Sequence, residues 1–341
     1  MASGPRIAIF GAGSIGCYVG GRLLAAGADV TFIGRSRIGD TLQQHGLMLT
    51  DLDGARLPVP PGRIRFSEDA HDLADADLVL VTVKSAATGE AGAALAARLH
   101  PGACVISFQN GIHNGDELAL RLPQQVVLTG MVPFNVVNRG EGRFHQGSEG
   151  RLAVQQHAAL APFLPLFRAA GLPPDTHDDI KPVQWAKLLL NLNNAVNALS
   201  GLPLKAELSQ RDFRRCVALA QQEGLTLFDA AGIRPAKLTP LPAHWIPGLL
   251  TVPDWLFRLL ANRMLAIDPL ARSSMWEDLE AGRATEIDWI NGELLQLART
   301  LDRTAPVNAR LIELVREAEQ GGRRNFSGTE LLAELRSAQG S

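Results

Sequence analysis

Short, almost continuously apolar runs alternate with helix-like stretches through the first half of the chain. The runs are residues 7–10, 29–33, 78–83 and 104–108. Such runs are typical of strands that a parallel sheet buries on both faces. Helical stretches at 17–26 and 86–99 lie between them. The alternation of strand and helix predicts a parallel sheet covered by helices.

The pattern changes twice more along the chain. Residues 47–64 are typical of a small hairpin excursion, and 126–155 contain short β-like pieces separated by glycines. The second pattern predicts antiparallel strands that complete the sheet. After a boundary near 178–182 the pattern is almost wholly helical, and 341 residues exceed a typical single core. We therefore expect an α/β fold with an α/β domain at 1–179 and a helical domain at 180–341.

A glycine motif follows the first apolar run directly. Gly11, Gly13 and Gly16 have G-x-G-x-x-G spacing between a strand and a helix. The first glycine allows a tight turn, the second lets the backbone approach a pyrophosphate, and the third lets the helix pack closely on the strand. A glycine-rich turn without a ligand is the weaker interpretation in this context. The residues predicted to hold a dinucleotide are Gly11, Ala12, Gly13, Ser14, Ile15 and Gly16.

The end of the second strand indicates which dinucleotide is bound. NAD-binding chains usually place a carboxylate there for the ribose 2′-hydroxyl, whereas this chain has Gly34, Arg35, Ser36 and Arg37. A guanidinium can grip a 2′-phosphate through charge-assisted hydrogen bonds. Two solvated loop charges are the alternative. We predict NADP(H), with Arg35 at the phosphate.

Two further polar positions follow buried strands. Lys84 comes directly after 78–83, and Asn110 follows 104–108 within Gln-Asn-Gly. Ligands of open α/β sheets bind beyond the carboxyl ends of the strands. An exposed lysine and an ordinary Asn-Gly turn are equally good interpretations from position alone.

A helix predicted over 185–201 carries polar residues where a packed helix would be apolar. Lys187, Asn191 and Asn194 fall within about 60° of one another at about 100° per residue. Asparagine is a poor helix former, and this stretch has four. A solvent-exposed face would normally carry Glu, Lys and Arg instead. The pattern favours a cleft lined by amides with one ammonium group.

A second predicted helix, 283–301, carries Glu286 on its apolar stripe. A buried carboxylate needs a partner, which Lys187 would supply. The alternative is that Glu286 lies near the helix start and is stabilised by the N-terminal dipole. Just upstream, the hydroxyls of Ser273 and Ser274 would suit a substrate carboxylate, or would cap a helix.

Composition excludes several classes of function. The net charge of −2 gives no support for binding to nucleic acid or an anionic membrane. The three cysteines are scattered, no signal peptide is evident, and no apolar run is long enough to span a bilayer, so we expect a cytoplasmic protein. The eight histidines show no metal-ligand spacing, so we expect no metal site.

Taken together, the motifs resemble those of ketopantoate reductases (2-dehydropantoate 2-reductases) over nearly the whole chain. They are GAGSIG at 11–16, VTVK ending at Lys84, QNG at 109–111, W-x-K-L-x-x-x-N at 185–191, SSM at 273–275, TEIDWING at 285–292 and PVN at 306–308. The resemblance implies a Rossmann-type N-terminal domain and NADPH-dependent reduction of ketopantoate to pantoate, on the route to pantothenate and coenzyme A.

The resemblance also implies residue roles. Lys187 matches the lysine that protonates the carbonyl oxygen, and Glu286 matches the glutamate that positions substrate and lysine, close to the cofactor. The residues implied to bind substrate are Asn110, Asn191, Asn194 and Ser274. Lys84 and Asn110 match cofactor-side positions. The expected partner is a 2-keto acid, with no nucleic acid or membrane, and a homodimer is left open.

Two departures from the family stand out. The family's second asparagine falls on Ala195 here, and Asn194, with Asn193 beside it, is the expected substitute. Residues 232–267 are longer and more apolar than in compact members, which leaves the identity of the keto acid open. The alternatives are a reductase of another branched or larger 2-keto acid and a non-catalytic NADPH-binding sensor.

Overall fold

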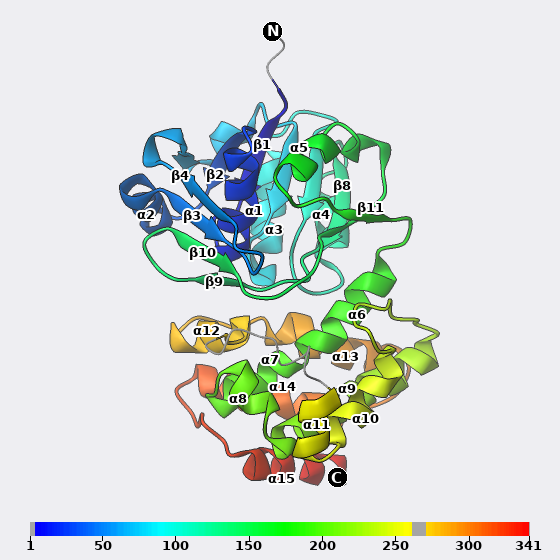
Figure 1. Ribbon diagram of the computed structural model, residues 1–341. Coiled ribbons are helices and arrows are strands. Elements are labelled where there is room, and N and C mark those ends of the chain that lie inside the picture. Colours follow the sequence, from blue (N-terminus) through cyan, green and yellow to red (C-terminus); the bar gives the residue numbers. More distant parts are fainter. Residues whose placement is uncertain (1–3, 261–270, 341) are drawn as a thin grey trace. The chain divides into compact units, whose positions relative to one another are not determined.

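The computed structural model describes residues 4–260 and 271–340 (Figure 1). The chain forms two compact units that divide between Ile180 and Lys181. The first unit holds every strand of the described chain, and the second is built from helices. The predicted α/β fold with a helical second half is confirmed.

An eight-stranded sheet forms the centre of the first unit. Its order is β12-β11-β8-β7-β6-β1-β2-β5, and the strands from β8 to β5 run parallel. Only β11 runs antiparallel to its neighbour β8. The strands are β1 (Arg6–Phe10), β2 (Asp29–Ile33), β5 (Arg65–Ser67), β6 (Leu78–Val81), β7 (Cys104–Ser107), β8 (Val126–Met131), β11 (Ala153–Gln155) and β12 (Asp175–His177).

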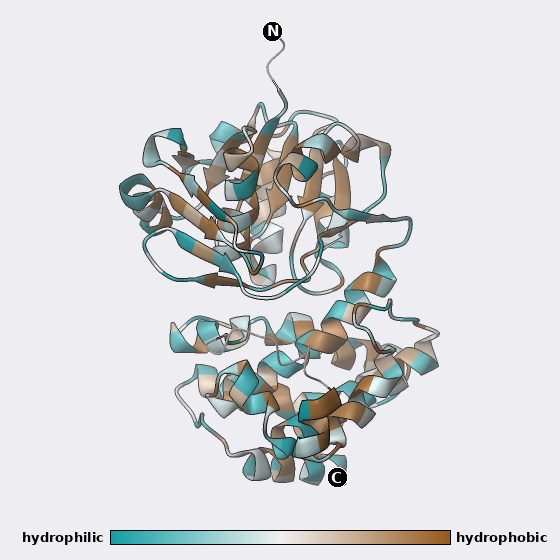
Figure 2. Cartoon of the chain, in the orientation of Figure 1, coloured by the Kyte–Doolittle hydropathy of each residue, from teal (hydrophilic) through white to brown (hydrophobic). Residues whose placement is uncertain are grey.

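Alternating side chains of these strands feed two separate cores. Ile7 and Ile9 of β1 pack on the face covered by α1 (Ser14–Ala25) and α5 (Leu164–Ala169). Ala8 packs on the opposite face, with residues of α3 (Thr88–Ala96) and α4 (Asn114–Arg121). Because both faces are covered, the strands are apolar throughout, which explains the continuous runs in the sequence and the brown strands in Figure 2.

A second, four-stranded sheet was not expected. Its order is β4-β3-β10-β9, with β3 (Leu47–Thr50), β4 (Arg56–Val59), β9 (Val136–Asn138) and β10 (Arg143–Gln146). The hairpin expected at 47–64 is present, but β9 and β10 pair with it instead of completing the main sheet. The prediction for 126–155 was therefore wrong for these two strands. Their glycine-bounded pattern indicates strands and carries no information about a partner 90 residues away.

Short helical segments complete the first unit. They are α2 (Ser36–His45) and the 3₁₀ turns η1 (Pro61–Arg63), η2 (Ala70–Leu73), η3 (Ser85–Ala87) and η4 (Ala158–Leu160).

The second unit packs its helices around α9 (Arg211–Ala231), whose buried face runs from Phe213 to Phe228. The other helices are α6 (Lys181–Asn191), α7 (Asn193–Ser200), α8 (Leu204–Leu208), η5 (Ala243–Trp245), α10 (Ile246–Thr251), α11 (Asp254–Leu260), α12 (Ser274–Glu280), α13 (Ile287–Thr300), α14 (Pro306–Glu319) and α15 (Gly328–Gln339). Ser327 caps α15 in a capping box with Glu330.

The described part of the apolar segment, residues 232–260, is joined to α9 by the buried Arg214. Arg214 donates to the carbonyl oxygens of Leu208, Leu250 and Val252 at 2.8–3.0 Å. Its guanidinium also pairs with Asp254 at 2.9 Å and stacks 4.1 Å from the centre of the Phe257 ring. Residues 261–267 of the segment lie outside the described residues.

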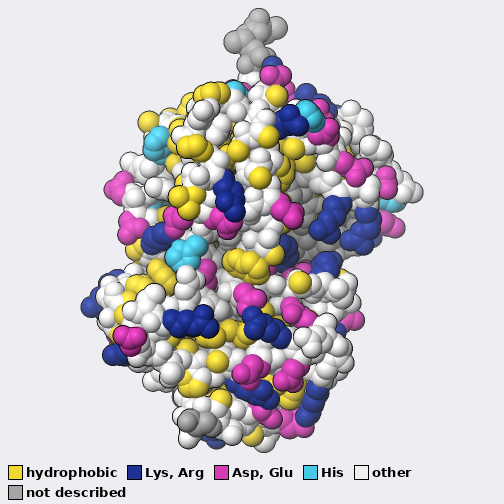
Figure 3. Space-filling model, turned by 180° about the vertical axis from the view of Figure 1, so that it is seen from behind, with side chains coloured by type: hydrophobic (Ala, Val, Ile, Leu, Met, Phe, Trp, Pro, Cys, Tyr) yellow, Lys and Arg dark blue, Asp and Glu magenta, His cyan; other side chains and the backbone are white. Residues whose placement is uncertain are grey.

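On the face drawn in Figure 3, basic and acidic side chains are interspersed. Within residues 4–260 and 271–340, no helix combines the length and the apolar character that crossing a membrane requires.

Candidate functional site

The glycine loop between β1 and α1 has the geometry of a dinucleotide cradle. Gly11 has φ +112°, and a Cβ there would lie 2.6 Å from the Val83 nitrogen. A Cβ on Gly16 would lie 2.6 Å from Thr82 Oγ1, a hydroxyl that donates to the Gly11 carbonyl. A Cβ on Gly13 would meet nothing within 4 Å. The first and third glycines thus permit close packing, and the second leaves open space at the start of α1, where a pyrophosphate fits.

The segment that follows β2 fits a phosphorylated ribose. The Ile33 carbonyl accepts from the backbone N–H groups of Gly11 and Ala12, so the end of β2 lies beside the glycine loop. Arg35 is the N-cap of α2, and both Arg35 and Arg37 are exposed. Residues 34–37 contain no carboxylate that would repel a 2′-phosphate. These residues therefore fit NADP(H) better than NAD(H).

Lys84 and Asn110 follow neighbouring strands of the sheet. Lys84 is exposed and occupies the N-cap position of η3 after β6, and Asn110 is half-buried after β7. The Ser85 hydroxyl donates to the Asn110 carbonyl at 3.2 Å, which joins the two loops. The structure thus brings both predicted residues to the carboxyl edge of the sheet.

Buried polar side chains beneath these loops fix their backbone. Asn114, only 4% exposed, donates to Ser85 Oγ at 3.1 Å and to the Asn110 carbonyl, and accepts from Thr88 Oγ1 at 2.8 Å. Gln109 donates to Thr88 Oγ1 and to the Val83 carbonyl. The network holds the two loops together, so Asn110 is presented from a rigid base.

The helix that carries Lys187 is interrupted, contrary to the continuous helix expected over 185–201. The helix α6 ends at Asn191, and α7 begins at Asn193, with Leu192 in a turn. The Gln221 side chain of α9 donates to the Leu189 carbonyl at 3.2 Å and so enters the backbone ladder at this point. An inserted side chain is an established cause of helix breaks, and the neighbouring asparagines weaken the ladder further.

Lys187 lies on α6 as a half-buried side chain. Burial lowers the pKa of its ammonium to about 8, because the charged form loses solvation. A lysine with this pKa exchanges a proton near neutral pH, whereas an exposed lysine holds its proton. Asn191, at the end of the same helix, is also half-buried.

The asparagines of α7 divide into two groups by burial. Asn193 and Asn194 are half-buried, whereas Ala195 and Asn197 are fully buried. Position 195 therefore lies inside the helical unit, and Asn194 stays the predicted substitute for the family's second asparagine.

Ser273 and Ser274 separate into two roles. Ser273 is the N-cap of α12, and its hydroxyl accepts from the Trp276 N–H at 3.1 Å. Ser274 is the first residue of that helix and is half-buried, and the described residues provide no hydrogen-bond partner for its hydroxyl. The capping function expected of the pair thus belongs to Ser273, and substrate binding by Ser274 stays a prediction.

Glu286 stands at the N-cap position of α13, so that helix starts later than the expected residue 283. The side chain is only 6% exposed and does not cap the helix by a hydrogen bond. The alternative that placed Glu286 at the helix start was therefore correct about position. Asp288, two residues further along α13, is exposed and forms a surface ion pair with Arg316.

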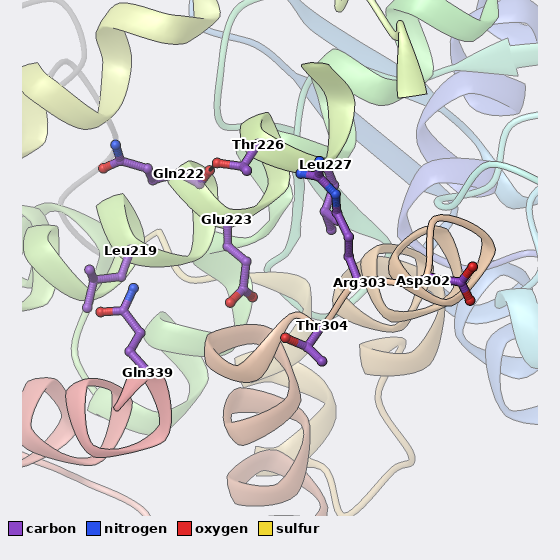
Figure 4. A pocket seen from close by; sticks show the side chains of 9 residues that line it. All are labelled: Leu219, Gln222, Glu223, Thr226, Leu227, Asp302, Arg303, Thr304 and Gln339. Carbon is purple, nitrogen blue, oxygen red and sulfur yellow. Dashed lines mark hydrogen bonds between the residues drawn. The ribbon is translucent and has the colours of Figure 1, made fainter. Parts of the chain in front are cut away.

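Two of the pockets among the described residues lie away from these positions. One, of about 600 Å³, lies between α9, α15 and the turn before α14 (Figure 4). In it Glu223 points from α9 toward the start of α14 and accepts from the N–H groups of Val307 and Asn308. The other, about 490 Å³, lies at the amino ends of β1 and β2. Neither contains a predicted site residue.

The cysteines have no reactive environment. Cys17, Cys104 and Cys216 are free and buried. Burial raises the pKa of the Cys104 thiol to about 12 and raises those of Cys17 and Cys216 as well. Cys17 donates weakly to the Ala12 carbonyl and is therefore a packing residue beside the glycine loop. Across the described part of the chain, no cluster of His, Cys, Asp or Glu could hold a metal ion.

Asn114 and Glu207 could not be singled out from the sequence. Both are buried polar residues next to predicted site segments. Asn114 occupies an ordinary helix start, and Glu207 lies in a short stretch, LPLKAEL, whose pattern suits a solvent-exposed carboxylate. Only the tertiary structure identifies them.

Comparison with known proteins matches both halves of the chain. A family model described as ketopantoate reductase PanE/ApbA matches residues 7–159, and its C-terminal counterpart matches 179–319. The 2-dehydropantoate 2-reductase of Halobacterium salinarum is 30% identical over 93% of this chain and 100% of its own length. That of Pyrococcus horikoshii is 29% identical over 93% and 98%.

Solved structures agree. A PanE/ApbA family ketopantoate reductase from Ralstonia eutropha has a TM-score of 0.77 at 30% identity, covering 93% of this chain and 99% of its own. A D-mandelate dehydrogenase, solved with NADH and anilino(oxo)acetate, has a TM-score of 0.76 at 20% identity over 93% and 99%. The second likeness concerns the fold alone.

Proposed function

This chain belongs to the ketopantoate reductase family, and from that premise we propose that it reduces 2-dehydropantoate to pantoate with NADPH. The observation that carries the proposal is the match to a 2-dehydropantoate 2-reductase at 30% identity over its entire length. Lys187, the lysine implied by the family motif, also has the lowered pKa that suits a proton donor.

The proposed chemistry requires one proton and one stabilised oxygen. The bound cofactor supplies hydride to the 2-keto carbon. Negative charge then develops on the carbonyl oxygen, and the Lys187 ammonium stabilises that charge and donates the proton. With a pKa of about 8, the ammonium is a better donor than an ordinary lysine.

Neutral groups orient the substrate in this proposal. Asn191 and Asn194 contribute amide groups without adding charge, and the Ser274 hydroxyl binds the substrate carboxylate. Glu286 is proposed to position substrate and lysine. Asn110 is proposed as a further substrate-binding residue, as the family motif implies.

The cofactor is proposed to lie on the glycine loop of residues 11–16. The open space above Gly13 and the start of α1 suit the pyrophosphate. The exposed Arg35 suits the 2′-phosphate, and Lys84 lies at the carboxyl edge of the sheet where the rest of the cofactor would run. A homodimer stays a prediction, measurable by sedimentation.

The test is NADPH oxidation with ketopantoate, run beside a panel of other 2-keto acids and with NADH. We expect NADPH-selective turnover of ketopantoate. Lys187→Ala should lower kcat by at least about 100-fold, the usual contribution of a general acid, while NADPH still binds. Glu286→Ala should weaken substrate binding and turnover but spare cofactor affinity.

Three outcomes would contradict the proposal or part of it. Tight NADPH binding without turnover of any keto acid would favour a cofactor-binding sensor. Selective turnover of a larger keto acid would instead assign the enzyme a different substrate and direct attention to residues 232–260. Near-normal kcat in the Lys187→Ala variant would rule out this lysine as the acid.

A further inference from the structure

The segment that delivers Ser274 is tied to the turn after α7. We call residues 271–274 the serine loop. Its backbone and side chains make four hydrogen bonds to residues 194–204, at 2.8–3.2 Å. The bonds join Leu204 N to Ala271 O, Arg272 Nη1 to Gly201 O, Ser273 N to Asn197 Oδ1, and Ser273 Oγ to Asn194 O.

Asn197 is the one side chain of α7 that reaches the backbone of this loop. It is fully buried, and its Oδ1 accepts the Ser273 N–H at 2.9 Å. Its Nδ2 donates to the Leu202 carbonyl at 2.9 Å and to Glu207 Oε2 at 2.6 Å. Both ends of the amide are used, so its orientation is fixed by three partners.

Glu207 is fully buried, and among the described residues no lysine or arginine forms an ion pair with it. Its second oxygen, Oε1, is buried and has no hydrogen-bond partner among the described residues. A buried carboxylate oxygen that no donor satisfies is costly while it carries charge, and a proton on Oε1 removes that cost. Burial also raises the pKa of Glu207 to about 8, which favours the protonated form at neutral pH.

We propose that Asn197, held by a neutral Glu207 carboxyl, is a positioning residue that sets the serine loop and thereby places the Ser274 hydroxyl for the substrate carboxylate. Glu207 accepts from Asn197 through Oε2, and its proton lies on Oε1. This inference rests on the proposed function, because it takes Ser274 as a substrate-binding residue.

A double-mutant cycle separates positioning from general stability. Asn197→Ala should raise KM for the keto acid about tenfold, the effect of losing one hydrogen bond that orients a binding group, and leave the NADPH Kd unchanged. Ser274→Ala should raise KM similarly. If Asn197 acts through Ser274, the double variant should match Ser274→Ala alone, whereas multiplied effects would overturn the proposal.

Asn308→Ala is the matched control. Asn308 is equally buried in the same unit and donates to a carboxylate, Glu223 Oε2, at 2.7 Å, but it makes no bond to the serine loop. It should lower Tm as Asn197→Ala does without raising KM. An equal rise of KM in Asn197→Ala and Asn308→Ala would show that Asn197 has a structural role only.

Glu207→Gln tests whether the Glu207 carboxyl is neutral. This variant keeps the proposal testable even if Asn197→Ala fails to fold. A glutamine amide offers one acceptor and one donor in the same places, so KM and Tm should stay within about twofold and a few degrees of wild type. Glu207→Leu should raise KM about tenfold. Loss of Tm in Glu207→Gln as large as in Glu207→Leu would refute a protonated Glu207.

Hydrogen exchange tests the positioning role of Asn197 independently of the proposed function. The Ser273 amide should exchange slowly in wild type and in Glu207→Gln, and at least tenfold faster in Asn197→Ala. This readout needs no substrate. A wild-type chain that does not reduce ketopantoate would therefore count against the proposed function, and an unchanged Ser273 exchange rate would count against the positioning role.

Discussion

At the scale of the residue, Lys187 is the group whose protonation should govern the rate. Burial lowers its pKa to about 8, so the ammonium required for reduction disappears as the pH rises through that value. We expect kcat/KM for the keto acid to be level below about pH 7 and to fall about tenfold per unit above pH 8. A pH profile of kcat/KM measures this.

The reverse reaction is the internal control for that profile. Oxidation of the hydroxy acid needs the neutral amine as base, so its rate should rise through the same pH. A forward profile that stays level to pH 10 would show that Lys187 keeps an ordinary pKa or is not the acid.

Arg35 should determine the preference for the phosphorylated cofactor. It is exposed directly after β2, where an NAD-binding chain would carry a carboxylate. Arg35→Ala should raise KM for NADPH about tenfold or more and leave KM for NADH little changed, because only NADPH carries the phosphate. Arg56→Ala removes an equally exposed charge from β4 and should alter neither value. A similar loss with both cofactors would exclude contact with the phosphate.

At the scale of the element, Arg214 joins α9 to the apolar segment that follows it. The guanidinium is fully buried and bonds to three carbonyls and Asp254. Arg214→Met should lower the free energy of unfolding by about 2–4 kcal/mol, because buried acceptors lose their donor.

Its neighbour Arg215 provides the comparison. Arg215 is half-buried and, within the part of the chain that the structure describes, pairs with Asp212 alone, so Arg215→Met should cost less than about 1 kcal/mol. Urea unfolding followed by circular dichroism measures both variants. An equal loss of unfolding free energy in Arg214→Met and Arg215→Met would mean that the Arg214 hydrogen bonds do not stabilise the packing of α10 and α11 on α9.

Elements whose structure depends on their own residues were predictable from the sequence. Features that depend on contacts with distant residues were not. The strands β1, β2, β6 and β7 follow from their continuous apolar runs, and the glycine loop follows from its spacing. The break at Leu192 depends on Gln221, a residue of another helix, so the periodicity of 185–201 could not reveal it. Glu207 is equally invisible, since its burial depends on Asn197 and the serine loop.

At the scale of the whole molecule, the family and the order of the two units were predictable because the motifs extend along nearly the entire chain. The partners of β9 and β10 were not, because strand pairing over long separations leaves no periodic trace in either segment. The pairing of β10 with β3 therefore came only from the structure.

That pairing predicts how the first unit tolerates truncation. A chain ending at residue 125 contains β3 and β4 but lacks β8 to β12, so it should not fold, whereas a chain ending at residue 180 contains every strand and should. Limited proteolysis of the two fragments distinguishes them. Protease resistance in the shorter fragment would show that β10 is dispensable.

The same pairing also has a consequence for synthesis on the ribosome. Roughly 90 residues separate β3 from the strand that covers its edge, a gap of about 5–20 s at ordinary rates of translation. During that interval the nascent hairpin presents an uncovered strand edge, the feature through which chains most readily pair with one another. We therefore expect newly made chains to be most prone to aggregation during those seconds, because β10 covers that edge only in the finished protein.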